Sequence, residues 1–161
     1  MNLTAEINAD RKRIDKLLKE LRDLDPLDST TLFSSLSEYI CIRIAGYLEV
    51  GVDSLLNAFV ERQTKDQRLR NVAAAHINGF RSANYQSICK LLSAFDEDWA
   101  KQFKKTFSNP DNIDIPTDID ALFTQRNTIA HGGQVYLDRT TLTRYFSSAS
   151  KLLKEIARLL N

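Results

Sequence analysis

The stretch TTLFSSLSEYICIRIAGYLEVGVDSLLNAFVER (Thr30–Arg62) decides the fold, because apolar residues recur along it at the spacing of an α-helix. They form a wide apolar surface made of Leu32, Phe33, Leu36, Tyr39, Ile40, Ile44, Tyr47, Leu48, Leu55, Leu56 and Phe59. We therefore expect one long helix that acts as the central strut of an all-α bundle. Gly46 and Gly51 interrupt it at a cost of about 1 kcal/mol each relative to alanine, so another backbone is expected to approach them closely.

The segments on either side of this stretch also repeat with a helical period. Residues 1–24 place apolar and charged side chains on opposite faces, which predicts an N-terminal packing helix. Its basic residues are interpreted as a solvated face, with contact to RNA as the alternative. A further helix after the central one is expected to bury Leu69 and Val72, with His76 as a core or interface histidine.

Local capping signals divide the rest of the chain into shorter helices. Asn84 and Asp96 are candidate N-caps, and a last helix is expected over residues 140–160. The longest loop is expected at residues 108–117, which contain two prolines. No internal repeat or linker is visible, so residues 1–161 are predicted to form a single domain.

Composition places the chain among ordinary globular proteins. It has 43% hydrophobic and 27% charged residues and a formal net charge of only +1, so any contact with nucleic acid should be local. Cys41 and Cys89 lack a metal-binding or redox spacing and are expected to be buried thiols in a reducing compartment. The N-terminus has no signal-peptide pattern and no window resembles a membrane span, so a cytoplasmic location is expected.

A second stretch, DIDALFTQRNTIAHGG (Asp118–Gly133), carries the local pattern that points to chemistry. Thr117 and Asp118 are candidate N-caps that follow Pro116, and the glycine pair Gly132–Gly133 is typical of a helix end. We therefore expect a short motif helix over residues 118–133.

Three polar residues near the end of this motif helix can converge. Arg126 falls within the apolar face, where an arginine needs a partner, and Asn127 and His131 lie four positions apart at the edge of that face. His131 would lie in the last helical turn, and a histidine suits proton transfer near neutral pH. Glu49 on the long helix is a candidate for orienting Arg126 or a group of a partner chain, and Arg43 is a second supporting residue. The alternative is that Arg126 only reaches a carboxylate and His131 is an ordinary polar residue.

The run from Arg126 to His131 resembles the R-x4-6-H signature of the HEPN superfamily, in which a polar residue usually follows the arginine, as Asn127 does here. The stretch Tyr39–Phe59 is similar to the long second helix of the RiboL-PSP-HEPN branch, and Asn84–Phe103 resembles its middle helices. The resemblance covers about residues 30–160 and implies a helical bundle that forms a homodimer.

The resemblance also implies a function. It suggests an endoribonuclease of the toxin or anti-phage type that works without a metal ion or other cofactor, with two motif helices facing each other across a dimer and an antitoxin or other regulator as a possible partner. Arg126 would then clamp the phosphate, His131 would move a proton, and Asn127 would orient the histidine or bind a phosphate oxygen. Two alternatives stay open. The chain could be an inactive HEPN-like module that dimerises or binds RNA or a nucleotide, or an interaction module in which the motif is accidental.

Overall fold

The computed structural model describes residues 5–24, 30–79 and 82–161, and within these ranges the chain is all-α, as predicted. In chain order the elements are α1 (Ala5–Asp23), α2 (Thr30–Gln63), α3 (Gln67–Asn78), α4 (Tyr85–Phe95), α5 (Glu97–Phe107), the 3-10 helix η1 (Pro110–Asn112), α6 (Asp114–Ala130) and α7 (Arg139–Leu159). The predicted N-terminal helix corresponds to α1, and its expected first residues, 1–4, lie outside the described part of the chain. None of the described helices is long and apolar enough to cross a membrane.

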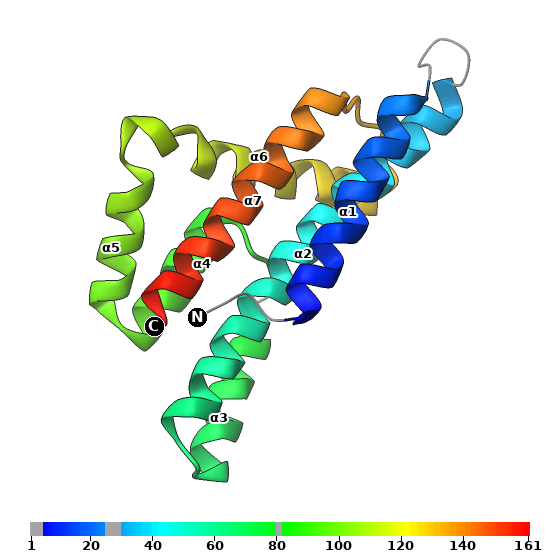
Figure 1. The fold of residues 1–161 in the computed structure, drawn as a ribbon. Coiled ribbons are helices and arrows are strands. Elements are labelled where there is room, and N and C mark those ends of the chain that lie inside the picture. Colours follow the sequence, from blue (N-terminus) through cyan, green and yellow to red (C-terminus); the bar gives the residue numbers. More distant parts are fainter. Residues whose placement is uncertain (1–4, 25–29, 80–81) are drawn as a thin grey trace.

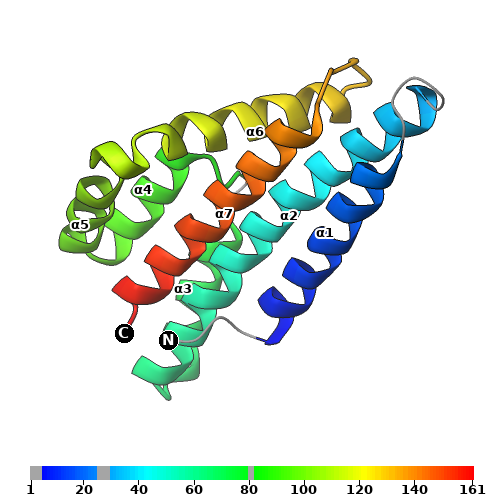
Figure 2. The same cartoon turned by 45° about the horizontal axis from the view of Figure 1, so that its top comes forward.

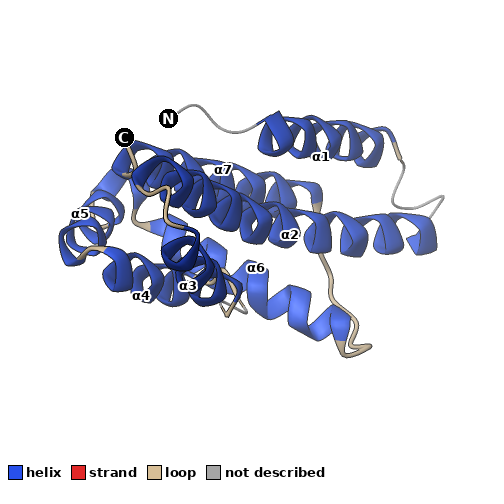
Figure 3. Ribbon diagram, turned by 90° about the horizontal axis from the view of Figure 1, so that it is seen from below, coloured by secondary structure: helices blue, strands red, loops and turns tan. Residues whose placement is uncertain are grey.

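Helix α2 is the central strut, because it packs against α1, α3, α6 and α7. Figure 2 shows α1, α2 and α7 running alongside one another, with α6 crossing near one end. Seen from below, α1 lies on one side of the layer formed by α2 and α7, and α6 lies on the other (Figure 3). Helices α3, α4 and α5 extend the bundle away from α1 (Figure 1). The motif helix α6 is therefore held against the two longest helices of the fold.

The contact between α2 and α7 depends on one of the two glycines that interrupt α2. A Cβ atom on Gly51 would lie only 2.6 Å from the Cδ1 atom of Leu153, a fully buried residue of α7. The close neighbour is therefore a side chain rather than the expected backbone. At Gly46 no atom from another described part of the chain lies within 4 Å of such a Cβ, so the expected close approach is not made within the chain and stays a prediction for a second copy. Of the expected apolar surface of α2, Leu32 and Tyr39 remain 56% and 50% exposed.

The shorter helices begin at the predicted caps. The Asn84 side chain accepts a hydrogen bond from the backbone N–H of Ser87, and Asp96 caps α5 in the same way. Cys41 and Cys89 are both buried free thiols, as expected.

Helix α3 departs from the predicted pattern. Leu69 and Val72 are 58% and 70% exposed, and His76 is also exposed, with its ring 6.2 Å from that of Phe95. The expectation that Leu69 and Val72 are buried was wrong, and His76 is not a core histidine; its alternative role at an interface stays a prediction. Helix α3 packs mainly against α2, with Ile77 buried and Ala73 partly buried against the core.

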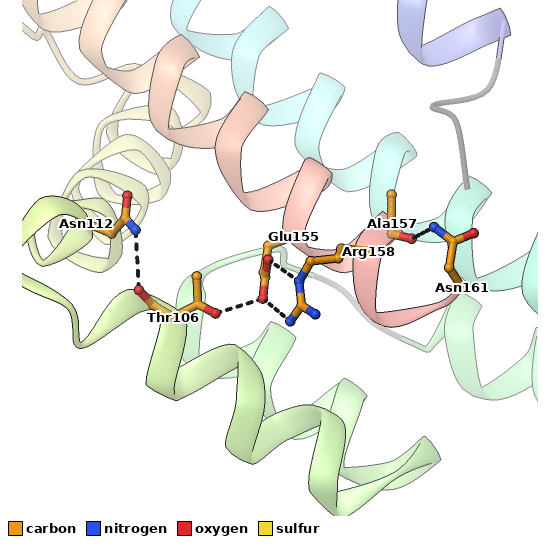
Figure 4. Close-up of polar contacts among 6 residues, drawn as sticks. All are labelled: Thr106, Asn112, Glu155, Ala157, Arg158 and Asn161. Atoms are coloured by element: carbon orange, nitrogen blue, oxygen red, sulfur yellow. Dashed lines mark hydrogen bonds and ion pairs between the residues drawn. The ribbon is translucent and has the colours of Figure 1, made fainter.

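A side-chain network fixes α5 against α7 (Figure 4). The Thr106 hydroxyl donates a 2.8 Å hydrogen bond to Glu155, whose carboxylate also accepts two hydrogen bonds from Arg158. The Arg158 hydrogen bond is the largest cause of the lowered pKa of Glu155. This network anchors the end of α7 that lies away from the motif.

The motif helix begins earlier than predicted. Helix α6 starts at Asp114, and Pro116 lies in its first turn, where a backbone N–H would have no partner within the helix. The expected 108–117 loop is therefore shortened. Asp118 is not an N-cap: it is buried, and it pairs with Arg144 at 2.9 Å and accepts a hydrogen bond from Ser148, both on α7. This buried pairing joins the start of the motif helix to α7.

Candidate functional site

Arg126 and Asn127 come together near the end of α6. The Nη1 atom of Arg126 donates a 3.0 Å hydrogen bond to the side-chain oxygen of Asn127, which is exposed. Asn127 thus contacts the arginine rather than His131. Ile119, Leu122 and Phe123 on the same helix are buried, which fixes the face from which Arg126 extends.

Glu49 of α2 lies behind Arg126, as the sequence suggested. The Nη2 atom of Arg126 is 3.7 Å from the Oε2 atom of Glu49, and the two side chains are 35% and 26% exposed. This separation makes an ion pair but is too long for a hydrogen bond. A guanidinium carries five N–H donors, so the contacts to Glu49 and Asn127 leave most of them for an anion such as phosphate.

A second carboxylate, Asp53, stands beside Glu49 on α2. The residues are four positions apart and share one side of the helix, a spacing that could have identified Asp53 from the sequence. Burial raises the pKa of Glu49, while Arg126 lowers it. Burial, and then the charge of Glu49, raises the pKa of Asp53 to about 6. The Glu49 Oε1 and Asp53 Oδ1 atoms are buried without a hydrogen-bond partner among the described residues. Burial thus disfavours the charged form of both carboxylates, of which Glu49 pairs with Arg126.

This arrangement predicts that Asp53→Asn stabilises the chain at neutral pH. In the wild type the carboxyl is protonated in both states below its ordinary pKa of 3.8, so stability falls only as pH rises from there towards about 6. Above that range the cost of burying the charged carboxylate no longer changes with pH. Replacement by asparagine removes this cost and should raise the free energy of unfolding by on the order of 1 kcal/mol, a value discounted for partial exposure. Urea unfolding of both proteins at pH 4 and pH 8 measures the difference. An equal difference at the two values would contradict the assignment.

Helix α6 ends at Ala130, and His131 is the C-cap residue that follows it, with an exposed side chain. The helix ends in a Schellman motif, in which Gly133 N–H donates to the Thr128 carbonyl at 2.8 Å and Gly132 N–H donates to the Ile129 carbonyl at 3.0 Å. Gly132 has a φ of 77°, in the left-handed region. The glycine pair therefore ends the helix as predicted, and the chain turns away from the helix axis immediately after His131.

Replacement of Gly132 by alanine should destabilise the protein by about 1–2 kcal/mol, because an L-residue is strained in the left-handed region. Gly79→Ala is the matched control: Gly79 also ends a helix, but its φ is −70°, and the added Cβ would meet only ordinary contacts at 3.4 Å. Thermal unfolding of both variants makes the comparison. Equal losses would show that backbone strain at Gly132 is not the cause.

One motif helix does not aim Arg126 and His131 in the same direction. Five positions turn a helix by about 140°, and the His131 imidazole makes no hydrogen bond or ion pair with any described residue. Arg43 does not join them either. It pairs at 3.0 Å with Asp10 of α1. Six positions separate Arg43 from Glu49, which places the two side chains about 120° apart around α2, so they extend in different directions. The chain on its own thus assembles Arg126, Asn127, Glu49 and Asp53, with His131 at the edge.

A groove of about 750 Å³ lies next to the end of the motif helix. The start of α2 and the loop after α6 line it, with hydroxyl side chains from α2 and with Gly132, Gly133, Gln134 and Tyr136 from the loop. Tyr136 is 91% exposed. The sequence indicated only that Val135–Leu137 could be extended, and it gave no signal that the loop would face the start of α2. An exposed aromatic ring beside a polar groove can stack on a base.

Among the residues that the structure describes, no group of three or more His, Cys, Asp or Glu side chains is placed so that it could hold a metal ion. The polar groups at this site are the Arg126 guanidinium, the His131 imidazole, the Asn127 amide and the carboxylates of Glu49 and Asp53.

Comparison with known proteins gives one match. The chain matches the family model described as RiboL-PSP-HEPN over residues 5–161, which includes all seven α-helices and the Arg126–His131 motif. No curated protein and no solved structure matches the chain.

Proposed function

This chain belongs to the RiboL-PSP-HEPN family, and from that premise we propose that it is an endoribonuclease whose active site is formed by two copies of the Arg126–His131 motif across a homodimer. The family membership makes the chain a HEPN-type nuclease or RNA-binding module. Cleavage, the composite site and the residue roles are the parts that we propose.

The observation that carries the proposal is the loosely held guanidinium of Arg126. Its 3.7 Å ion pair with Glu49 keeps the group in place at a half-exposed position, and it leaves donors for two oxygens of a phosphodiester. An arginine that served only to neutralise an internal carboxylate would be expected to make a closer, hydrogen-bonded pair.

Two copies of the motif solve a geometric problem of the reaction. When a ribose 2′-hydroxyl attacks the adjacent phosphorus, its proton must leave on one side, while the departing 5′-oxygen must gain a proton on the opposite side. One His131 cannot serve both sides, whereas a two-fold axis through the site supplies two. One histidine accepts the 2′ proton, the other donates a proton to the 5′-oxygen, and the products are a 2′,3′-cyclic phosphate and a 5′-hydroxyl.

The surface of α2 supports dimerisation near the site. Tyr39, Ile42 and Val50 are 50%, 40% and 41% exposed, and they flank Gly46, where an added Cβ would meet no other described part of the chain within 4 Å. These positions follow a helical stripe on the same helix as Glu49. An exposed apolar stripe with a glycine at its centre suits close packing of a second copy.

We further propose a cytoplasmic toxin or anti-phage role, with a regulator protein that restrains cleavage. An RNase active at all times would damage its own cell, so the proposed activity requires control. The hydroxyl-lined groove beside Tyr136 is where RNA next to the scissile bond would lie.

The experiment is incubation of the purified protein with single-stranded RNA in the presence of a chelator. We expect cleavage that leaves 2′,3′-cyclic phosphate ends, and a mass in solution of two chains. A monomeric protein that leaves RNA intact would contradict the proposal.

The second candidate is a HEPN-like module that binds RNA or a nucleotide without cleaving it. One observation favours it: the His131 imidazole is exposed and no described residue orients it. RNA binding without any cleaved product, in a protein confirmed to be dimeric, would select this candidate.

A further inference from the structure

A separate groove lies between α1 and α7. It has a volume of about 670 Å³ and is lined by side chains of both helices. None of its lining residues belongs to the motif helix α6, although Arg144 in its wall pairs with Asp118 near the start of that helix. Figure 3 shows that the α2 and α7 layer separates α1 from α6. The groove shares no lining residue with the Arg126–His131 motif.

The groove concentrates positive charge. Lys19 and Arg22 of α1 and Arg139 and Arg144 of α7 line it, and Asp15 is the one acidic residue in the described part of its lining. The whole chain has 22 basic and 21 acidic residues, whereas the described lining of the groove has four cations and one carboxylate. Asp23 and the buried Asp118 pair with two of these cations from outside the lining, and a local excess of positive charge remains. A concave surface of one sign attracts and concentrates counter-ions of the other sign.

The two cations of α7 are held in place by the fold. Arg139 donates a hydrogen bond to the Leu24 carbonyl and lies 5.7 Å from the centre of the Phe33 ring. Arg144 pairs at 2.9 Å with the buried Asp118, but its own side chain is 59% exposed. Both guanidinium groups are therefore positioned before any ligand arrives, which lowers the cost of binding.

The two cations of α1 are available to a ligand. Lys19 and Arg22 are three positions apart and share one face of the helix. Among the described residues Lys19 makes no ion pair, and Arg22 pairs only with Asp23, where both side chains are about two-thirds exposed. Such an exposed pair is weak and readily exchanged. Thr140 and Ser147 add exposed hydroxyl groups to the same groove.

We propose that this groove binds phosphate groups, either of a free nucleotide or of an RNA strand. Guanidinium forks and hydroxyl donors match the tetrahedral oxygens of phosphate, and the lining offers both kinds of donor. The site is separate from the one proposed for cleavage, because the two share no residue.

The test is the double variant Lys19→Glu with Arg22→Glu in the full chain. Binding of a fluorescent single-stranded RNA 12-mer and of ATP is measured by anisotropy and calorimetry over a range of salt concentrations. We expect affinity to fall at least about 10-fold, and the slope of log K against log salt for RNA to become less steep by about 1.4, the value for two lost phosphate contacts. Loss for ATP as well as RNA identifies a site that also accepts a free nucleotide, and loss for RNA alone identifies the strand backbone.

The control is Lys65→Glu with Arg68→Glu, which makes the same charge change at exposed positions next to α3. We expect it to leave binding of both probes within about 2-fold, because exposed charges far from the ligand are screened by salt. Equal weakening by the two double variants, or no weakening by the first, would overturn the proposal. The His131→Ala protein should bind ATP in this groove as the wild type does. Binding in the groove and cleavage at the motif are therefore tested separately, and either proposal can fail without the other.

Discussion

Replacement of His131 by alanine is expected to lower the rate of RNA cleavage by about 10²–10⁴-fold, the usual contribution of a general acid or base. The loss should appear in kcat rather than in KM, because the imidazole moves a proton and Arg126 holds the phosphate. Folding should be unaffected, since the side chain is exposed and the helix end is formed by backbone hydrogen bonds of Gly132 and Gly133. Single-turnover cleavage of a labelled RNA, with thermal unfolding of the same samples, measures both effects.

His76→Ala provides the matched control for this experiment. His76 is the other histidine of the chain, and it is also exposed. It lies on α3, which Figure 1 shows at the bottom of the molecule, well below α6. We expect its replacement to leave cleavage unchanged. If both histidine variants cleave as fast as the wild type, the observed nuclease is not this site.

The second large effect concerns Gly51 and Leu153, which join α2 to α7. Leu153→Ala should cost about 2–5 kcal/mol through lost burial and the cavity that remains. Gly51→Ala should cost about 1–3 kcal/mol, because its Cβ would overlap the buried Leu153 side chain. In the double variant the new methyl group enters the space that Leu153 vacates. The double variant should therefore be more stable than the sum of the single losses predicts, by about 0.5–3 kcal/mol.

Leu152 supplies the control for this cycle. It is as deeply buried as Leu153 and is the preceding residue of α7, so it points in a different direction around the helix. Leu152→Ala combined with Gly51→Ala should give additive losses in urea unfolding. Additivity in the Leu153 pair as well would show that the close contact with Gly51 has no energetic consequence.

Features encoded by neighbouring residues could be predicted from the sequence. The length of α2 follows from its apolar period, and the caps at Asn84 and Asp96 follow from side chains that bond the next turn of their own helix. The end of α6 followed in the same way from Gly132 and Gly133. Each of these features depends on residues within one or two turns.

Features that depend on distant partners could not be predicted. Asp118 has the sequence context of an N-cap, but Arg144 and Ser148 of α7 bind it inside the bundle. Arg43 pairs with Asp10 of α1, a contact across 33 positions that no local pattern indicates. Leu69 and Val72 of α3 are exposed because no described helix covers that part of its apolar face, which the spacing of Val72 could not reveal.

In the candidate site too, some residues could be predicted from the sequence and other features depend on the packed structure. The motif residues Arg126, Asn127 and His131 were identified in the sequence, and Glu49 was identified because an arginine on an apolar face needs a carboxylate. The raised pKa of Asp53 depends on burial, which is a property of the packed structure. The groove beside Tyr136 required the loop after α6 to meet the start of α2.

The central claim is that each active site uses His131 from two chains, and a subunit-mixing experiment tests it most directly. Wild-type protein is mixed with increasing amounts of His131→Ala protein and allowed to exchange subunits. Cleavage is then measured at constant total concentration. If both histidines are needed, mixed dimers are inactive, so activity should fall with the square of the wild-type fraction. A linear fall with the wild-type fraction would show that each chain cleaves RNA with its own motif, and it would contradict the composite site.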